Sequence, residues 1–323
     1  MKNKIFSVFL PFSGCKQRCL FCDQPNISGA EMPTPQEVAQ NVLDSPEVFD
    51  ELAFYGGSFT ALPQAVFRSY LEIGKTLIEK GKIHGIRIST RPDAINENIL
   101  KSLINHGVTT IELGVQSFDD TVLAKNRRPH DSAQIFHAVH WIRQFPLQLG
   151  LQMLPGLLDA SLASDRISWQ KALSLKPDFL RLYPLVIFEN TALATLYREG
   201  HFRLHSFEEM IALSADFVQL AQQAEIPIIK LGLQVSRPQA IVAGYYHPNF
   251  SQLVYSHIWK NIFFRLQIPS NNDMLLVAAS QFNNAIGFRK ENLHFLERRA
   301  RRKIAIKTDN SLRNFDYRFS RNA

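Results

Sequence analysis

The sequence of 323 residues predicts an α/β protein, in which a partial (β/α)6, TIM-like barrel is followed by a small C-terminal α+β appendage. Three observations predict this fold. Short apolar runs alternate with helical patterns as far as Tyr183, which is the order of a parallel sheet with crossover helices. Polar residues and glycines gather where the apolar runs end. Positive charge gathers close to the C-terminus.

Each β/α unit can be placed on the sequence by its pattern. The expected barrel strands are residues 5–12, 51–55, 86–90, 109–115, 147–153 and 179–183, and the helices between them are residues 36–43, 63–80, 96–105, 132–144 and 161–175. A helix over residues 206–224 and a strand over 226–233 follow. We therefore expect a barrel over residues 1–232, a lid or connector over 233–272 and a basic module over 273–323.

Composition places the chain among ordinary globular proteins. Hydrophobic residues make up 46% of the chain and charged residues 20%, with 15 Gly and 16 Pro, which excludes a disordered, collagenous or coiled-coil chain. The apolar run at residues 5–12 is too short for a secretory signal and contains Pro11. No other apolar stretch approaches the roughly 20 residues that span a bilayer. We therefore expect a cytoplasmic protein with no membrane partner.

All three cysteines of the chain lie in one short segment. Cys15, Cys19 and Cys22 form the pattern Cys-x3-Cys-x2-Cys, and an odd, clustered set does not form a disulfide framework. Thiolates at this spacing on a loop can bind one iron–sulfur cluster, and a four-iron cluster normally takes four protein ligands. Three cysteines leave one iron open, which is typical of a catalytic metal site. The alternative is a structural zinc, but no His or Cys follows at the spacing of a fourth zinc ligand.

This cysteine segment resembles the radical S-adenosylmethionine (SAM) superfamily. The resemblance implies a [4Fe–4S] cluster on the three cysteines, with the amine and carboxylate of SAM on the open iron. It also implies that Phe21, the aromatic residue before the third cysteine, packs near the adenine of SAM. Reductive cleavage of SAM to a 5′-deoxyadenosyl radical is the chemistry of that superfamily, so we expect a reductant such as flavodoxin or ferredoxin as a partner.

Further candidate ligands of SAM lie where the expected strands end, which is where parallel barrels carry their chemistry. After the second strand come Gly56, Gly57 and Ser58, where paired glycines let the main chain approach a ligand closely. In the resembled superfamily this position binds the methionine amine of SAM.

The next three strands supply polar side chains. Ser89 is expected to meet the ribose or carboxylate of SAM, and Arg91 to pair with its carboxylate. The alternative for Arg91 is an ion pair with Asp93 that braces the turn. Glu112 and Gln116 share one face of a strand by the two-residue period, and such groups in a barrel mouth need partners.

The fifth and sixth strands contribute Gln152 and Arg181 as candidate ligands, although packing could also explain these two side chains.

The motif sequences most resemble the radical SAM domain of the Elongator catalytic subunit and its stand-alone bacterial relatives. The matching segments are residues 54–60, 112–117, 181–184 and 190–193. Oxygen-independent coproporphyrinogen oxidase is less similar, because its cysteine motif continues with a further cysteine where this chain has Gln24.

The C-terminal segment resembles a second family. A strand over residues 275–279, helices over 281–286 and 291–301 and a strand over 303–307 are expected there. This β-α-α-β order, with Gly287-Phe288-Arg289-Lys290 between the helices, resembles the KH RNA-binding module. In that module a GxxG loop grips the nucleotide backbone. Here Lys290 replaces the second glycine and adds a phosphate-binding charge.

The net charge of +7 belongs to residues 289–323, and a cationic patch on a neutral body indicates a polyanionic partner such as RNA, with tRNA expected. The alternative is a basic module that packs on the barrel or binds another protein. The predicted RNA-binding residues are Gly287, Arg289, Lys290, Arg298, Arg299, Arg301 and Arg302.

Three functions stay open on the sequence alone. The first is a radical SAM enzyme that acts on RNA, with a tRNA base presented to the radical. The second is a radical SAM enzyme that acts on a small metabolite. The third is a non-catalytic, cluster-containing RNA-binding protein. Cleavage of SAM separates the third from the others, and salt-sensitive RNA binding separates the first from the second.

Overall fold

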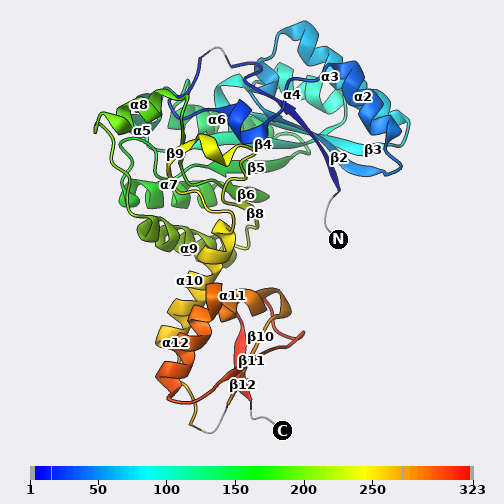
Figure 1. Ribbon diagram of the computed structural model, residues 1–323. Coiled ribbons are helices and arrows are strands. Elements are labelled where there is room, and N and C mark those ends of the chain that lie inside the picture. The colour runs from blue at the N-terminus through cyan, green and yellow to red at the C-terminus, as the bar shows by residue number, and fades with distance from the viewer. Residues whose placement is uncertain (1–3, 16, 271–272, 321–323) are drawn as a thin grey trace. The chain divides into compact units, whose positions relative to one another are not determined.

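The computed structural model describes residues 4–15, 17–270 and 273–320 of the chain (Figure 1). The chain forms two compact units, Met1–His205 with Leu220–Tyr246, and Ser206–Gln219 with His247–Ala323. Among the described residues, no helix is both long enough and apolar enough to cross a bilayer.

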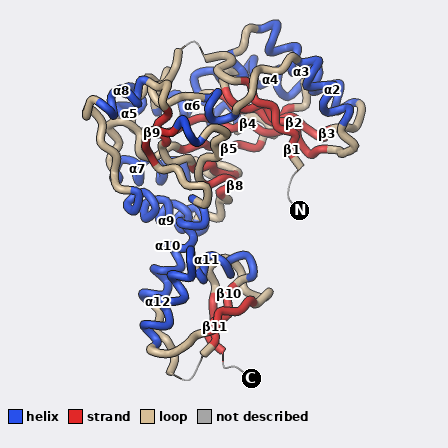
Figure 2. The backbone as a smooth tube through the Cα atoms, viewed as in Figure 1, coloured by secondary structure: helices blue, strands red, loops and turns tan. Residues whose placement is uncertain are grey.

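A seven-stranded parallel sheet forms the centre of the first unit, in the order β1-β2-β3-β4-β5-β6-β8. Every neighbouring pair in it is parallel. The sheet curls into a half-barrel with helices packed against it (Figure 2), which confirms the predicted α/β, TIM-like class. Its strands are β1 Ile5–Leu10, β2 Phe49–Gly56, β3 Ile83–Thr90, β4 Val108–Gln116, β5 Gln148–Met153, β6 Phe179–Leu182 and β8 Ile228–Leu231.

Helices connect consecutive strands, and the longer ones lie within a few residues of the expected ranges. Thr34 begins the second helix by accepting a hydrogen bond from the Glu37 N–H, while the Glu37 carboxylate accepts from the Thr34 N–H. Such a capping box fixes the residue at which a helix starts. The helices are α1 Gln24–Ser28, α2 Pro35–Asp44, α3 Gln64–Glu79, α4 Glu97–Asn105, α5 Asp120–Lys125, α6 Ser132–Ile142, α7 Leu162–Ser174, α8 Ala192–Arg198 and α9 Phe207–Gln223.

The first unit also contains a small second sheet, which was not predicted from the sequence. β7 Val186–Phe188 pairs antiparallel with β9 Ile241–Gly244, joining segments that are distant in the sequence. Gly244 allows this approach, because it has a φ of 106° and a Cβ there would lie 2.5 Å from the Leu185 carbonyl oxygen. Strands this short carry too little alternation to be recognised from sequence.

The second unit contains the expected small α+β appendage, a three-stranded sheet of order β11-β10-β12. β10 Met274–Val277 pairs parallel with β11 Ala305–Thr308 and antiparallel with β12 Tyr317–Ser320. Three helices contribute to its structure: α10 Phe250–Arg265, α11 Phe282–Ile286 and α12 Glu291–Ala300. The shared core contains Trp259, Phe263, Leu266, Leu275, Val277, Ala285, Leu296, Ile304 and Ile306.

Helix α10 lies within the segment that we expected to be a lid or connector, and no helix was predicted there. Trp259 and Phe263 of this helix are fully buried in the core of the second unit. Its buried residues do not fall on a single stripe of period 3.6, so no amphipathic pattern marks the helix in the sequence. They are Phe250, Val254, Ser256, Ile258, Trp259 and Phe263.

The interior of the half-barrel holds a row of paired charges, which we call the charge ladder: the buried Glu51, Arg87 and Glu112, and the half-buried Arg181. Arg87 pairs with Glu51 at 2.5 Å between Nη2 and Oε2, and with Glu112 at 2.8 Å between Nη1 and Oε1. Arg181 pairs with the same Glu112, at 2.7 Å between Nε and Oε2. Because an unpaired buried charge costs several kcal/mol, the four side chains hold one another in place.

Replacing Arg87 by Met should lower the free energy of unfolding by about 3–5 kcal/mol, because it leaves two buried carboxylates without this cation. Urea denaturation followed by circular dichroism measures the change. The control is Lys101→Met, which breaks an exposed ion pair with Glu97 and should change the free energy of unfolding by less than about 0.5 kcal/mol. Equal stability of Arg87→Met and the wild type would contradict the role given to the ladder.

Candidate active site

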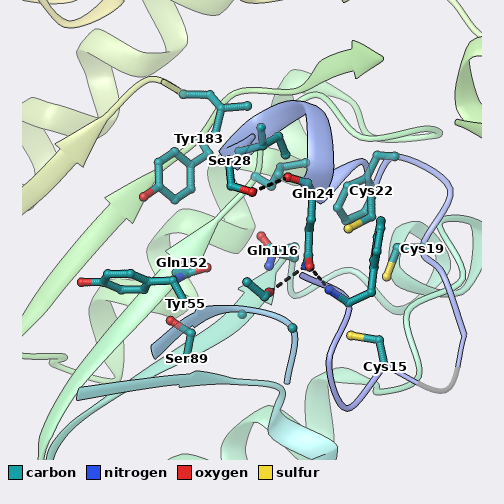
Figure 3. Close-up of a pocket in the computed structure, with 18 of the residues that line it drawn as sticks. Cys15, Cys19, Cys22, Gln24, Ser28, Tyr55, Ser89, Gln116, Gln152 and Tyr183 are labelled. Atoms are coloured by element: carbon teal, nitrogen blue, oxygen red, sulfur yellow. Dashed lines mark hydrogen bonds between the residues drawn. The ribbon is translucent and has the colours of Figure 1, made fainter. Parts of the chain in front are cut away.

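A large cavity opens at the carboxyl ends of the strands in the first unit (Figure 3). Its volume is about 850 Å³, which lies within the range of roughly 300–1,000 Å³ of ligand sites. The structure brings residues from separate strands and from the cysteine loop into one wall. The predicted residues in this wall are Cys15, Cys19, Phe21, Cys22, Gly56, Gly57, Ser89, Arg91, Gln116, Gln152 and Arg181.

The cysteines lie on the loop between β1 and α1, and hydrogen bonds fix this loop from both sides. The Leu20 N–H donates to the Asn126 carbonyl, and the Leu20 carbonyl accepts from the Leu193 N–H. Within the loop, the Cys22 N–H donates to the Cys19 carbonyl at 3.2 Å. The backbone that carries the thiols is therefore held by residues far along the chain.

The surroundings of the thiols suit a bound metal cluster. Burial raises the pKa of the Cys22 thiol to about 12 and also raises that of Cys15, so thiolates there need positive charge nearby. Arg128 supplies part of it, by donating to the Cys19 Sγ at 3.3 Å. The described side chains include no group of three His, Cys, Asp or Glu placed around one metal ion. A four-iron cluster does not need one, because its cysteines bind different irons.

The glycines that end β2 make room for the cysteine loop. A Cβ on Gly57 would lie 1.9 Å from the Ser13 carbonyl oxygen and 2.5 Å from the Ser13 nitrogen, so only glycine fits there. The next residue, Ser58, donates its N–H to the same carbonyl at 2.7 Å. Gly56 has a φ of 107°, and a Cβ on it would lie 2.8 Å from the Leu10 carbonyl oxygen. The glycine pair therefore seats the loop as well as lining the cavity.

Gln24 is a residue of the cavity wall for which no role was predicted from the sequence. Its side chain accepts a hydrogen bond from the Phe12 N–H and donates one to the Gly56 carbonyl at 2.7 Å. These bonds join the chain on both sides of the cysteines to the end of β2 (Figure 3). No sequence pattern marks Gln24, because the role depends on partners that only the fold brings close.

Ser58 does not reach the cavity wall, although contact with the cofactor was predicted for it. Its side chain is fully buried, and its Oγ bonds the Thr90 hydroxyl at 2.8 Å and accepts from the Arg91 N–H at 3.2 Å. Ser58 therefore positions the end of β3. Ser89, in contrast, lines the cavity, and its buried Oγ has no hydrogen-bond partner within the described chain. A bound ligand would satisfy this hydroxyl.

Arg91 lines the cavity, but its guanidinium pairs with Asp93 at 2.9 Å and 3.0 Å. This is the alternative that the sequence left open. On its other side, Asp93 lies 3.8 Å from His130. Burial opposes ionisation of Asp93, yet the contacts with His130 and Arg91 hold its pKa well below its usual range. Arg91 is therefore braced at the wall by its own turn.

Glu112, for which contact with the cofactor was predicted, is paired with side chains of the half-barrel interior. The residue is fully buried and is not part of the wall. Besides the two arginines of the charge ladder, the Gln152 side chain donates to it at 2.9 Å. Its oxygens are therefore occupied by protein donors, and its effect on the site passes through Gln152 and Arg181, which do line the cavity.

Gln116 ends β4 in an unusual backbone conformation. Its φ is 70°, which costs of order 1 kcal/mol for a residue other than glycine. The pairing of β4 with β5 is irregular between Gly114 and Gln116, and the Leu154 N–H donates to the Gln116 carbonyl at 2.9 Å. The surrounding structure thus maintains the strain that sets this residue in the cavity wall (Figure 3).

The predicted RNA-binding loop lies between α11 and α12 in the second unit. Gly287 has a φ of 80°, and Arg289 and Lys290 have φ values of 50° and 62°. A Cβ on Gly287 would lie 2.8 Å from the side chain of Asn292, which donates to the Ser256 carbonyl at 2.8 Å. The loop is therefore pinned on α10, while both of its cationic side chains are exposed.

Two of the predicted RNA-binding arginines donate hydrogen bonds to backbone carbonyls of the second unit. Arg299 donates to the carbonyls of Phe263 and Leu266 at the end of α10, and Arg302 donates to the carbonyl of Pro269. These bonds satisfy carbonyls that a helix end leaves without partners. Arg289, Lys290, Arg298, Arg299 and Arg301 of the predicted set are exposed, whereas Arg302 is half-buried.

Comparisons with known proteins match this architecture to two family models. Residues 9–163 match the model of the Radical SAM superfamily, and residues 177–260 match the Radical_SAM C-terminal domain. The solved archaeal Elp3 of Methanocaldococcus infernus, with an N-terminal deletion, superposes with a TM-score of 0.58 at 21% identity, over 81% of this chain and 64% of that one. That similarity shows a shared fold.

Two curated relatives are similar in sequence. The chain is 30% identical over 182 residues to the tRNA uridine(34) acetyltransferase of Dehalococcoides mccartyi (strain CBDB1), which covers 54% of this chain and 39% of the relative. It is 27% identical over 232 residues to Elongator complex protein 3 of Mus musculus, which covers 64% of this chain and 41% of the relative. The matched part is thus about two fifths of either relative.

Gly57→Ala should unseat the cysteine loop, because the new methyl group meets backbone atoms that cannot rotate away. We expect the free energy of unfolding to fall by about 1–3 kcal/mol, and Cys22 of the cluster-free chain to react faster with a thiol reagent. Urea denaturation and mass spectrometry of labelled peptides measure the two effects.

The matched control for this variant is Gly81→Ala. Gly81 has a φ of 68° with no atom within 4 Å of the position of a Cβ. The control should lose about 1 kcal/mol through backbone strain and keep the slow labelling of Cys22. Wild-type labelling rates in Gly57→Ala would show that the loop is not seated as described.

Proposed function

The chain belongs to the radical SAM superfamily, and we propose that it is an enzyme of that superfamily that modifies tRNA. The observation that carries the proposal is the position of Cys15, Cys19 and Cys22 in one cavity wall at the carboxyl ends of a parallel half-barrel. Barrels of this kind carry their chemistry at those ends. The cofactors of the superfamily, and of this chain, are a [4Fe–4S] cluster and SAM.

We assign the cluster to the three cysteines and SAM to the adjoining cavity. The unpartnered Ser89 hydroxyl and the strained Gln116 supply polar contacts to SAM. Phe21 supplies a surface for the adenine. Gly56 and Gly57 allow the backbone to approach SAM closely. When bound and given an electron by a reductant such as flavodoxin or ferredoxin, the two cofactors supply a 5′-deoxyadenosyl radical.

One part of the wall is apolar and suits the protection of reactive species from water. Leu154, Leu185, Val186 and Phe188 all line the cavity, and the last three are almost fully buried. An apolar wall excludes solvent, which limits side reactions of the radical. The chain's own contribution is thus to orient the cofactors and to keep the site dry.

tRNA is supported as the substrate by the relatives and by the loop of the second unit. One relative is named a tRNA uridine(34) acetyltransferase, although the match covers well under half of it. Arg289 and Lys290 stand exposed at the start of the ten-residue helix α12. Cations and backbone N–H groups at a helix start suit phosphate oxygens.

Replacing any one of Cys15, Cys19 or Cys22 by Ala should abolish the visible absorption of the reconstituted cluster and the formation of 5′-deoxyadenosine. The reason is that the chain has only these three cysteines, so no other thiol takes the vacated iron. Anaerobic reconstitution, iron analysis and chromatography after addition of SAM and reductant measure both. Lys101→Met should retain both properties, and a cysteine variant that retained them would refute the assignment.

The double variant Arg289→Ala/Lys290→Ala should bind bulk tRNA more weakly in gel-shift titrations. In a plot of the logarithm of affinity against the logarithm of salt concentration, the slope should become shallower by roughly 1 for each phosphate that the variant no longer neutralises. The control, Lys75→Ala/Lys80→Ala on and beside α3, removes the same charge from exposed sites in the first unit and should bind like the wild type. Equal affinities of both variants would favour a small-molecule substrate.

A further inference from the structure

The side of the cavity opposite the cysteines has a chemistry of its own. Figure 3 shows Tyr55, Gln152 and Tyr183 there, across the cavity from the three thiols. Arg181 of β6 joins them, because it is in register with Gln152 of β5 on one side and with Lys230 of β8 on the other. All five side chains belong to residues of the cavity wall.

This end of the cavity carries more positive than negative charge. Arg181 forms an ion pair with Glu112, and the same carboxylate also forms an ion pair with Arg87. Lys230 adds a further cation, and its Nζ lies 2.5 Å from the neutral Gln234 Oε1. Among the described residues, no acidic side chain forms an ion pair with Lys230. Burial, and then repulsion by Arg181, lower the pKa of Lys230.

Two phenols point hydrogen-bond donors into the same region. Arg181 donates to the Tyr183 hydroxyl at 3.0 Å and to the Tyr55 hydroxyl at 3.1 Å, so each phenol oxygen already accepts and its own O–H is left to donate. Burial raises the pKa of Tyr55 to about 12 and also raises that of Tyr183. The phenols therefore keep their protons, as donors to an anion must.

We propose that Lys230, Arg181 and the hydroxyls of Tyr55 and Tyr183 form a subsite for an oxyanion, a carboxylate or a phosphate, of a second ligand that binds beside SAM. The inference rests on the proposed function, in which the cysteines hold the cluster and the carboxylate of SAM binds its open iron, as the resemblance to the superfamily implies. An anion at the opposite end therefore belongs to another molecule. An ammonium in register with Arg181, in a wall that also holds two phenols, bonds such a group by charge-assisted hydrogen bonds. This role replaces the predicted contact of Arg181 with SAM.

The test is an anion titration of the full chain, with cluster and SAM, at low ionic strength. Acetate and inorganic phosphate are the probes, followed by saturation transfer and by phosphorus line broadening. We expect at least one of them to bind with a dissociation constant near the millimolar range. The anion that binds more tightly identifies the group carried by the second ligand. If neither binds, the proposal is overturned.

Lys230→Met should weaken anion binding by about tenfold or more, while Lys101→Met should not change it. Tyr183→Phe, which removes one donor and keeps the ring, should weaken it by a smaller factor. The affinity for SAM should be the same in Lys230→Met as in the wild type. If Lys230→Met leaves anion binding unchanged, or weakens SAM binding equally, the subsite does not serve a second ligand and the proposal is wrong.

Failure of the proposed function gives a different result. In that case the wild type forms no 5′-deoxyadenosine with reductant and SAM, which is measured on the same samples. The anion titration is then repeated on the cluster-free chain, where the ladder and the phenols are unaltered. Binding that depends on Lys230 in that titration would support the subsite, and its loss would overturn it.

Discussion

The pairing of buried charges inside the half-barrel is the constraint on which the site depends. Arg87 lies between Glu51 and Glu112, and Arg181 continues the row from Glu112. Ions in an apolar interior are tolerated only with close partners, so the strands that carry them must keep their register. Since side chains on a strand repeat every two residues, this register also fixes which groups face the cavity. Arg181, at the end of the ladder, and Gln152, which bonds Glu112, line the cavity for that reason.

The second constraint is the close fit of the cysteine loop on the end of β2. Gly57 leaves no space for a side chain opposite Ser13, and Gln24 bonds the loop to the Gly56 carbonyl. The thiols are therefore positioned from the sheet and not by the loop alone. The charge ladder positions Gln152 and Arg181 in the cavity wall, and the hydrogen-bonded loop positions the cysteines. Together these two sets of bonds place the residues that we assign to the cofactors.

The alternation of strands and helices predicted the half-barrel, and most of the residues predicted for the cluster and SAM lie in the cavity wall. Depth within the barrel was not predictable. Glu112 and Gln116 share a strand face, yet one lies in the ladder and the other at the cavity. Charge counting likewise cannot tell a free arginine from Arg299, which bonds the end of α10. Such roles depend on partners distant in the sequence.

The two ends of the cavity differ in chemistry, and this difference bears on which ligands the cavity can bind. The cysteine end offers thiols and the cation of Arg128, which suit a metal cluster with an amino-acid group upon it. The far end offers an ammonium and phenols, which suit an oxyanion and are not ligands of an iron–sulfur cluster. A ligand anchored by its charge at the far end would extend toward the cysteines across the apolar wall. The distance between its anion and the atom nearest the cysteines would then decide which second ligands fit the cavity.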